Sequence, residues 1–266
     1  MFERFLSSSK KLVSRGLNKS SGRKFRIFYD ENQVYNENAK LINELVTNKQ
    51  SLGTFLEIGI EHGITFEAVR FKKKIGVDPN PLFYNFRPYR SKVIRDTSDN
   101  FFNTLELNTL FQFIYIDGLH VFDQVFRDLT NSLMHLDQFG TILIDDTIPA
   151  DEFSALPSFE ECVVSRKRQT GIDSTVWHGD VFKIVHLLAE EFTDSLEYFT
   201  LGDAWNPKTV VKFRHEKNNE MLRKKISSIN LEKYRRIEFK EAFIKGVTPK
   251  FFNVVTTTSA IRTLHA

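Results

Sequence analysis

Residues 111–147 constrain the fold most, because they read as a complete strand, helix and strand unit. The apolar run 111–116 is short, aromatic and β-branched, and it stops at Asp117, which is typical of a buried parallel strand that meets a turn. Apolar residues then recur at steps of three and four, which predicts an amphipathic helix. Gly140 predicts the end of that helix, and residues 141–144 predict a second buried strand.

Acidic residues follow both strands of this unit. Asp117 comes after the first strand, and Asp145 and Asp146 come after the second. A right-handed crossover carries the ends of neighbouring parallel strands to one edge of the sheet, where strands lie about 4.8 Å apart, so we expect the three carboxylates to converge. They cannot all stay ionised unless a cation or a donor-rich ligand lies among them, which makes this edge a candidate site. The alternative is that each acid only caps a turn or a helix.

Composition indicates a globular protein with an aromatic interior, since 41% of the 266 residues are hydrophobic and 26 are Phe. This length allows one large α/β domain with extensions. Cys162 is the single cysteine, which excludes an internal disulfide and a cysteine-based zinc cluster and fits a reducing cytoplasm. No apolar run reaches the roughly 20 residues that cross a bilayer. The net charge of +3 is too small to indicate nucleic acid binding by itself.

Positive charge is concentrated near the start of the chain, where residues 4–29 contain basic side chains and no acid. This composition fits a presequence or a helix on a membrane surface, and equally a terminal arm that is loose or packed on the domain. We expect residues 1–52 to form this basic arm and a first helix. After His215, basic and acidic residues alternate as on a solvated helix, which disfavours a nucleic acid as partner.

The remaining pattern predicts strand and helix units followed by an antiparallel hairpin, which describes a doubly wound, mainly parallel α/β sheet of seven strands. The expected strands are residues 54–60, 74–77, 92–95, 111–116, 141–144, 196–201 and 209–213. We assign residues 53–214 to this core and residues 215–266 to a helical extension and tail. Residues 148–177 form a long irregular stretch, which is typical of a lid over a site. Asp180 then predicts the N-cap of a helix.

The turn after the first strand contains Gly59 and Gly63, and glycine there lets the backbone approach a ligand closely. A dinucleotide site requires GxGxxG, whereas this turn has Glu61 where the second glycine belongs, so a pyrophosphate is disfavoured. Glu57 at the strand end suits a cationic or amine-bearing ligand. Asp78 follows the second strand and is placed to accept both hydroxyls of a ribose.

With these motifs, residues 54–213 resemble the class I S-adenosylmethionine (SAM)-dependent methyltransferases. The segments LEIGIEHGIT, GVDPNP, IDGLH and LIDDT are most similar to metal-dependent O-methyltransferases of the catechol and macrocin-sugar types. Residues 97–102, 117–122 and 179–183 are similar to bacterial methyltransferases found with surface-polysaccharide genes. The resemblance implies a Rossmann-like fold, SAM as cofactor, and an acceptor hydroxyl on a small molecule, a sugar or a polysaccharide precursor.

The resemblance also implies cofactor contacts, residue by residue. The implied cofactor-binding residues are Glu57, Gly59, Gly63, Asp78, Ser98, Asp99 and Asp117. In this assignment the glycine turn frames the methionine part of SAM, Asp78 holds the ribose, and the Ser98-Asp99 stretch contacts the adenine. Asp117 would approach the cofactor from the fourth strand.

A metal site is implied as well, with Asp117, Asp145 and Asp146 as ligands of Mg²⁺. An all-carboxylate set with water suits a hard cation of this kind rather than zinc. Where this chain has Asp145-Asp146, catechol-type enzymes have Asp followed by Asn. The Asp-Asp pair here is the macrocin-like version.

Two histidines are candidates for the general base. His120 stands three residues after Asp117, where catechol-type enzymes have their catalytic lysine, and a histidine there can take a proton from a substrate hydroxyl. The alternative is that His120 caps the following helix or bonds to a neighbouring acid. His178, beside Trp177 at the end of the lid, is the second candidate.

The sequence therefore predicts a SAM-dependent O-methyltransferase that is assisted by Mg²⁺. Three alternatives stay open: a metal-independent methyltransferase with another acceptor, a non-catalytic binding protein with the same fold, and a nucleic-acid methyltransferase. Whether identical copies assemble is open too.

Overall fold

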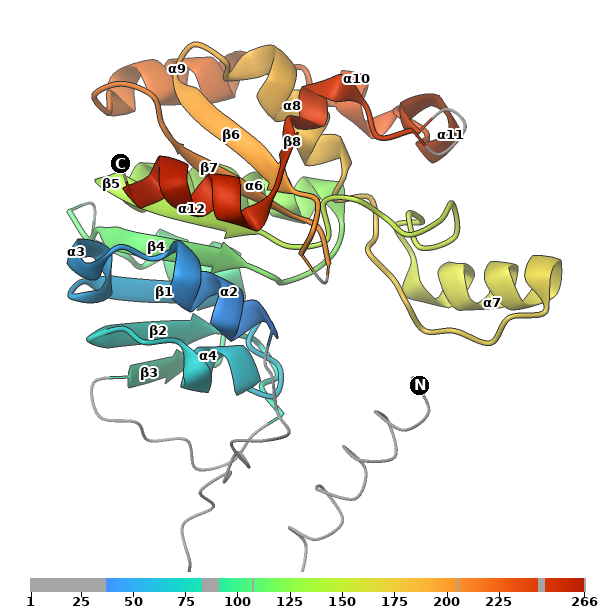
Figure 1. Cartoon of the computed structure of the whole chain (residues 1–266), viewed down its shortest axis with the longest axis horizontal. Helices are drawn as coiled ribbons and strands as arrows, with labels where there is room; N and C mark the ends of the chain where they lie inside the picture. Colours follow the sequence, from blue (N-terminus) through green and yellow to red (C-terminus); the bar gives the residue numbers. More distant parts are fainter. Residues whose placement is uncertain (1–36, 83–90, 107, 205, 244–246, 266) are drawn as a thin grey trace, which may run out of the picture.

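A sheet of eight strands forms the centre of the computed structural model, which describes residues 37–82, 91–106, 108–204, 206–243 and 247–265 (Figure 1). The strand order is β3-β2-β1-β4-β5-β7-β6-β8, and β7 runs antiparallel to both of its neighbours while the other pairs are parallel. The strands are β1 Thr54–Ile58, β2 Lys73–Val77, β3 Ser91–Ile94, β4 Phe111–Ile116, β5 Leu136–Ile144, β6 Leu196–Leu201, β7 Lys208–Phe213 and β8 Val254–Val255. The Rossmann-like doubly wound sheet with one reversed strand is therefore confirmed, and β8 is an edge strand that the sequence pattern did not predict.

Helices cover both faces of this sheet (Figure 1). One face packs against α2, α4 and α12, and the other packs against α5, α6, α8 and the segment after β7. The helices are α2 Glu37–Leu45, α3 Asn48–Ser51, α4 Ile64–Ala68, α5 Ser98–Asn103, α6 Phe122–His135, α7 Phe159–Thr170, α8 Lys183–Glu191, α9 Asn219–Ser228, α10 Leu231–Arg235, α11 Phe239–Ala242 and α12 Thr257–His265. A short 3-10 helix, η2 Lys250–Phe252, precedes β8.

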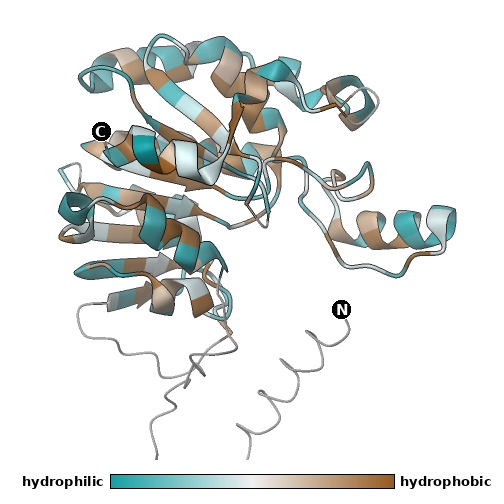
Figure 2. Cartoon of the chain, viewed as in Figure 1, coloured by the Kyte–Doolittle hydropathy of each residue, from teal (hydrophilic) through white to brown (hydrophobic). Residues whose placement is uncertain are grey.

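Strand β4 shows why the sequence folds in this way. Phe113 and Tyr115 point into the cluster beneath α2 and α4, whereas Ile114 and Ile116 point into the cluster beneath α6 and α8. All four side chains are almost completely buried, so both faces of the strand must be apolar, as in other central parallel strands. Figure 2 shows the resulting pattern of hydrophobic central strands and helices that alternate between hydrophobic and hydrophilic segments.

The structure differs from the sequence expectation most clearly at two places. Helix α6 ends at His135 and β5 begins at once with Leu136, so Gly140 lies inside the strand rather than ending the helix. The expected irregular stretch 148–177 contains the twelve-residue helix α7. Turn-forming residues around this helix, rather than its interior, made the segment look irregular.

The segment after β7 is a series of short helices rather than one long helix. Leu222 of α9, Tyr234 of α10 and Phe252 of η2 belong to the same buried cluster as α6 and α8, so this segment is packed on the sheet. The boundaries between an arm, a core and an extension stay predictions. The basic arm expected before residue 37 lies outside the described residues. Among the described helices, none combines the length and apolar character that crossing a membrane requires.

Candidate active site

Strands β1, β4 and β5 end at the same level, at one edge of the sheet. The backbone N–H of Asp117 donates to the carbonyl of Ile58 at 2.9 Å, and that of Asp145 donates to the carbonyl of Ile116 at 3.0 Å. The acids that follow β4 and β5 are therefore brought to the same edge, as the strand, helix and strand pattern predicts.

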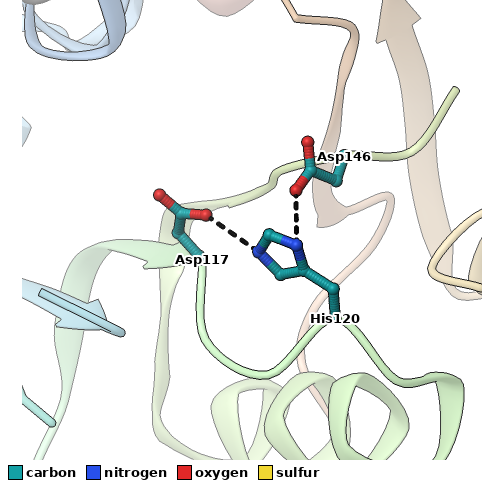
Figure 3. Close-up of side chains that lie close together, drawn as sticks. All are labelled: Asp117, His120 and Asp146. Atoms are coloured by element: carbon teal, nitrogen blue, oxygen red, sulfur yellow. Dashed lines mark ion pairs between the residues drawn. The ribbon is translucent and has the colours of Figure 1, made fainter. Parts of the chain in front are cut away.

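At this edge His120 lies between two carboxylates, those of Asp117 and Asp146 (Figure 3). Its Nδ1 is 2.9 Å from Oδ2 of Asp146, and its Nε2 is 3.5 Å from Oδ1 of Asp117. Asp146 has a φ of 59°, a left-handed conformation that residues other than glycine rarely adopt and that is often found at functional sites. One atom from each of the three side chains lies within 4.8 Å of the others, so the set can hold a metal ion.

Burial and mutual charge govern the protonation of this cluster. Burial, followed by the negative charge of Asp145, raises the pKa of Asp117 to about 7. Burial alone would lower the pKa of His120, but bonds to Asp117 and Asp146 outweigh it and hold that pKa well above its usual range. The pKa of Asp146 is lowered, because its contacts with His120 outweigh its own burial. Without another cation present, His120 is thus an imidazolium that balances the two acids.

The carboxylate of Asp145 bonds to a different set of partners from that of its neighbour Asp146. Its Oδ1 accepts from Nζ of Lys208 at 2.7 Å and from Nδ2 of Asn206 at 3.0 Å. Its Oδ2 accepts a short hydrogen bond from the Tyr115 hydroxyl. Lys208 is 1% exposed, so this is a buried and almost fully satisfied ion pair. The structure thus places His120, rather than Asp145, beside Asp117 and Asp146, and Asp145 as a metal ligand stays a prediction.

Two residues tie the two sets together. The Tyr115 hydroxyl lies 3.1 Å from Oδ2 of Asp117 and accepts from Nδ2 of Asn38 at 2.8 Å. Asn206 donates to Asp145 and also makes a short hydrogen bond to Asp146. Tyr115 therefore links Asp117 with Asp145, and Asn206 links Asp145 with Asp146. Movement of one acid in each pair affects the other through a neutral side chain.

The glycine turn lies beside this cluster. Gly59 has a φ of 82°, and a Cβ added there would lie 2.0 Å from the carbonyl oxygen of Asp117, so only glycine fits. The Asp78 carboxylate accepts from the backbone N–H groups of Ile60 at 3.1 Å and Glu61 at 2.9 Å. It thus fixes the turn to β2, and its expected contact with a ribose stays a prediction. Gly63 has a φ of 69° and directly precedes α4.

Glu57 is the clearest sign of a ligand at this turn. Its carboxylate is 2% exposed, and Oε2 has no hydrogen-bond partner among the described residues. Burial, followed by the charge of Asp117, raises the pKa of Glu57 well above its usual range. An unpaired buried carboxylate costs free energy until a cationic or amine donor reaches it. The amine of a SAM methionine portion fits this requirement.

The expected adenine-contacting residues pack against α6. Gln124 donates to the Ser98 hydroxyl at 3.1 Å and to the Asp99 carboxylate at 3.3 Å, and Arg127 pairs with Asp99 at 3.2 Å. Asp128 is buried beside them, and burial raises its pKa to about 6. Ser98 and Asp99 therefore have partners on a neighbouring helix, and their contact with a cofactor stays a prediction.

The lid reaches the cluster through its last residues. The ring of Trp177 stacks on His120 with 5.1 Å between centroids, and Phe159 of α7 meets Trp177 edge-on. His178 lies 3.2 Å from Oδ1 of Asn206 and 3.9 Å from Oδ1 of Asp146, and burial lowers its pKa. Gly179 passes so close to the backbone of His120 that a Cβ would clash with it. Both base candidates are therefore within one cluster.

Sequence reasoning missed several residues of this site, because no local motif marks them. They are Asn38, Tyr115, Gln124, Asp128, Asn206 and Lys208. One signal was available for the last two. The reversed strand β7 starts where β5 ends, with Thr209 opposite Ile144, so the polar residues at and just before the start of β7 must lie beside the Asp145-Asp146 pair.

Comparison with known proteins agrees with this geometry. Residues 56–147, from β1 through the end of β5, match the model of a family described as a methyltransferase domain. No curated protein matches the chain. Among solved structures, an O-methyltransferase from Bacillus cereus in complex with SAH is 11% identical, with 77% of this chain and 88% of that chain covered and a TM-score of 0.46.

Two further solved structures have similar values. The cofactor-bound Rv0187 from MTB is 13% identical, with 70% of this chain and 84% of that chain covered and a TM-score of 0.45. The N-methyltransferase NodS from Bradyrhizobium japonicum WM9 is 14% identical, with 68% and 94% covered and a TM-score of 0.39. These values are too low to transfer an acceptor or a residue role. The family match identifies a SAM-dependent methyltransferase domain over residues 56–147, and the topology of the sheet is that of the Rossmann-like methyltransferase fold.

Proposed function

We propose that this methyltransferase transfers the methyl group of SAM to a hydroxyl oxygen of a small molecule, a sugar or a polysaccharide precursor. The observation that carries the proposal is the cluster at the strand ends, in which His120 lies between two carboxylates and His178 lies 3.9 Å from Asp146. A hydroxyl acceptor must lose a proton as it is methylated, and His178, whose pKa burial lowers, is suited to take it because His120 already holds a proton between the two acids.

The cofactor fit rests on two features of the glycine turn. Gly59 leaves room for close approach of a ligand to the backbone, and the unpaired carboxylate of Glu57 is available to an ammonium group. SAM supplies an electrophilic methyl group on a sulfonium sulfur. As the acceptor oxygen bonds to the methyl carbon, the carbon–sulfur bond breaks, and the hydroxyl proton passes to His178. Positioning of the two reactants supplies most of the rate enhancement, about 7–11 kcal/mol in well-oriented systems.

A divalent cation fits the same residues. Asp117, His120 and Asp146 would hold it, and when bound it would lower the pKa of an acceptor hydroxyl. Because Asp145 is already paired with Lys208, His120 rather than Asp145 is the third ligand in this proposed set. Because imidazole also suits softer metals, this set admits ions such as Mn²⁺ besides the Mg²⁺ that the sequence suggested. His120 would then be a ligand, which leaves His178 to take the proton.

A second candidate is a metal-independent methyltransferase. One observation favours it: the charges at the strand ends are already balanced, with His120 between two acids and Lys208 on the third. In that enzyme His120 keeps its proton between the two acids, and His178, whose pKa burial lowers, takes the proton of the acceptor.

The test is Asp146→Asn, which removes one charge beside both histidines. With labelled SAM and a panel of hydroxyl acceptors, we expect methyl transfer to fall by about 100-fold or more, the range for loss of acid–base catalysis. We expect SAH affinity in calorimetry to be nearly unchanged. Asp123→Asn on the exposed face of α6 is the matched control, because within the described part of the chain Asp123 pairs with Arg235 at the surface.

Metal dependence is tested separately, by calorimetry of Mn²⁺ and Mg²⁺ with the chelator-treated protein. Binding that Asp146→Asn abolishes, together with activity that returns on adding the ion, supports the metal-assisted reaction. Full activity after chelation favours the metal-independent candidate. Wild-type methyl transfer to nitrogen acceptors alone would contradict the proposed hydroxyl acceptor.

A further inference from the structure

Helix α7 projects from the side of the domain (Figure 1). Cys162 and Arg166 on one side of the helix are buried against the returning segment after it. Arg166 pairs with Asp151 at 3.1 Å and donates to the carbonyls of Ser174 at 3.0 Å and Val176 at 2.8 Å. We call this unit, residues 157–176, the α7 arm. Its own contacts fix the helix, so its outer face keeps a defined shape.

The outer face of α7 is centred on Val164, which is 63% exposed. At about 100° per residue, Val164 lies about 160° around the helix from both Cys162 and Arg166. The residues that flank Val164 on this face are charged, and they are Glu160, Glu161, Lys167 and Arg168. The face opposite the anchoring contacts is therefore an exposed valine between two pairs of charges.

These charges are arranged symmetrically about Val164. The acids lie three and four residues before it, and the bases lie three and four residues after it. A two-fold axis at Val164 would therefore bring the acidic end of one helix against the basic end of a second, antiparallel copy. The helix dipole also favours acids first and bases last, but it does not place an exposed valine midway between them.

The existing partners leave most of these charges available. Among the described residues, Glu160, Glu161 and Arg168 form no salt bridge within 4.0 Å, while Lys167 pairs with the exposed Asp173 at 2.8 Å. Figure 2 shows that α7 alternates hydrophobic and hydrophilic segments although it lies away from the sheet. We propose that α7 is a self-association surface, on which a second copy of this chain docks in antiparallel orientation through Val164 and the flanking charges.

The placement of the arm is compatible with this dimer. Because α7 points away from the sheet, antiparallel pairing puts the two domains at opposite ends of the paired helices (Figure 1). One helix from each copy buries less than the roughly 1,200–2,000 Å² of a stable interface. The dimer is therefore expected to dissociate on dilution and to weaken as salt screens the charges.

The test is a charge swap followed by sedimentation equilibrium on the full chain. The double variant Glu160→Lys/Glu161→Lys makes the outer face wholly basic, and Lys167→Glu/Arg168→Glu makes it wholly acidic. Each variant alone is expected to self-associate at least about tenfold more weakly than the wild type, since attraction becomes repulsion at both ends. A mixture of the two variants is expected to form a heterodimer at least as tight as the wild-type dimer.

Val164→Asp is the second variant, and it should weaken the wild-type dimer without changing the circular dichroism of the domain. Recovery in the mixture excludes misfolding as the reason for loss in each charge variant. A wild-type chain that stays monomeric up to near-millimolar concentration overturns the proposal. So does a dimer that all of these substitutions leave intact, or a mixture of the two variants that fails to associate.

Discussion

Two buried tyrosines place their hydroxyls against two carboxylates each, in two different regions of the molecule. Tyr115 on β4 meets Asp117 and Asp145 at the edge of the sheet, and Tyr234 on α10 meets Glu190 and Glu191 of α8. The rings are equally buried, at 0% exposure. The difference lies in Asp145, which is 5% exposed, whereas the side chains of Asp117, Glu190 and Glu191 are 28%, 46% and 22% exposed.

This difference in exposure distinguishes the candidate site at the sheet edge from the structural packing of α10 against α8. At the sheet edge, the charge of Asp145 cannot be hydrated and depends on Lys208, which is itself 1% exposed. Between α8 and α10, Lys225 pairs with Glu191 at 2.7 Å and Lys233 makes a short ion pair with Glu190, but both lysines reach solvent. Water can replace one set of partners and not the other. The same pairing of groups is therefore essential in one region and nearly optional in the second.

The largest expected effect comes from removing a lysine in each region. Lys208→Met leaves a buried carboxylate without its cation and should lower the free energy of unfolding by about 3–5 kcal/mol. Lys225→Met should cost less than about 1 kcal/mol, because Glu191 becomes hydrated. Chemical denaturation of both variants measures the contrast. A loss below 1 kcal/mol for Lys208→Met would show that Asp145 does not need its cation. Adding Asp145→Leu should recover part of the loss.

A smaller contrast is expected from the tyrosines themselves. Tyr115→Phe leaves an oxygen of a buried acid without its donor, at a cost of about 1.5–3 kcal/mol, whereas Tyr234→Phe should cost about 0.5–1.5 kcal/mol. Thermal or chemical unfolding checks both values. Methyl transfer is expected to fall for Tyr115→Phe, since its hydroxyl touches Asp117, and to stay at the wild-type level for Tyr234→Phe. Equal losses of stability and activity in the two variants would remove the distinction between the regions.

The smallest expected effect is a dependence of stability on pH, and it arises in the region of α8 and α10. Burial lowers the pKa of His186 on α8 to about 4, whereas an unfolded histidine titrates near about 6.5. Between these values only the unfolded chain takes up the proton, so the stability that neutral His186 gives is full above pH 6.5 and is lost as pH falls towards 4. Because the ring is partly exposed, we expect a loss of about 1 kcal/mol. Denaturation of wild type and His186→Gln at several pH values should show a steeper decline for the wild type.

Much of the fold could be predicted from local pattern. The apolar run before Asp117 and the helical spacing after it specify β4 and α6, because a strand that is buried on both faces and a helix that is buried on one leave different periodicities. Residues 136–140 were not placed correctly, since the turn from α6 into β5 occurs without an intervening loop. Helix α7 was missed because most of its side chains are exposed, so its apolar periodicity is weak.

The candidate site could be predicted only in outline. Asp117, Asp145 and Asp146 follow strands, so their meeting at one edge follows from chain topology. The orientation of each carboxylate does not follow in the same way. Asp180, expected to cap the helix of its own segment, instead accepts from the backbone N–H of Phe122 at 2.6 Å and so caps α6. That choice depends on which helix lies within reach of the side chain.

Periodicity and the handedness of the crossover specify the buried β4, the apolar face of α6 and the meeting of Asp117, Asp145 and Asp146 at one edge, so these features could be predicted from the amino-acid sequence. The division in which Asp146 meets His120 while its neighbour Asp145 meets Lys208 becomes visible in the folded protein alone. A pair of adjacent acids offers no local signal for that division. It arises because β7 runs against β5 and delivers a lysine to one carboxylate, and buried charges take the partner that lies within bonding distance.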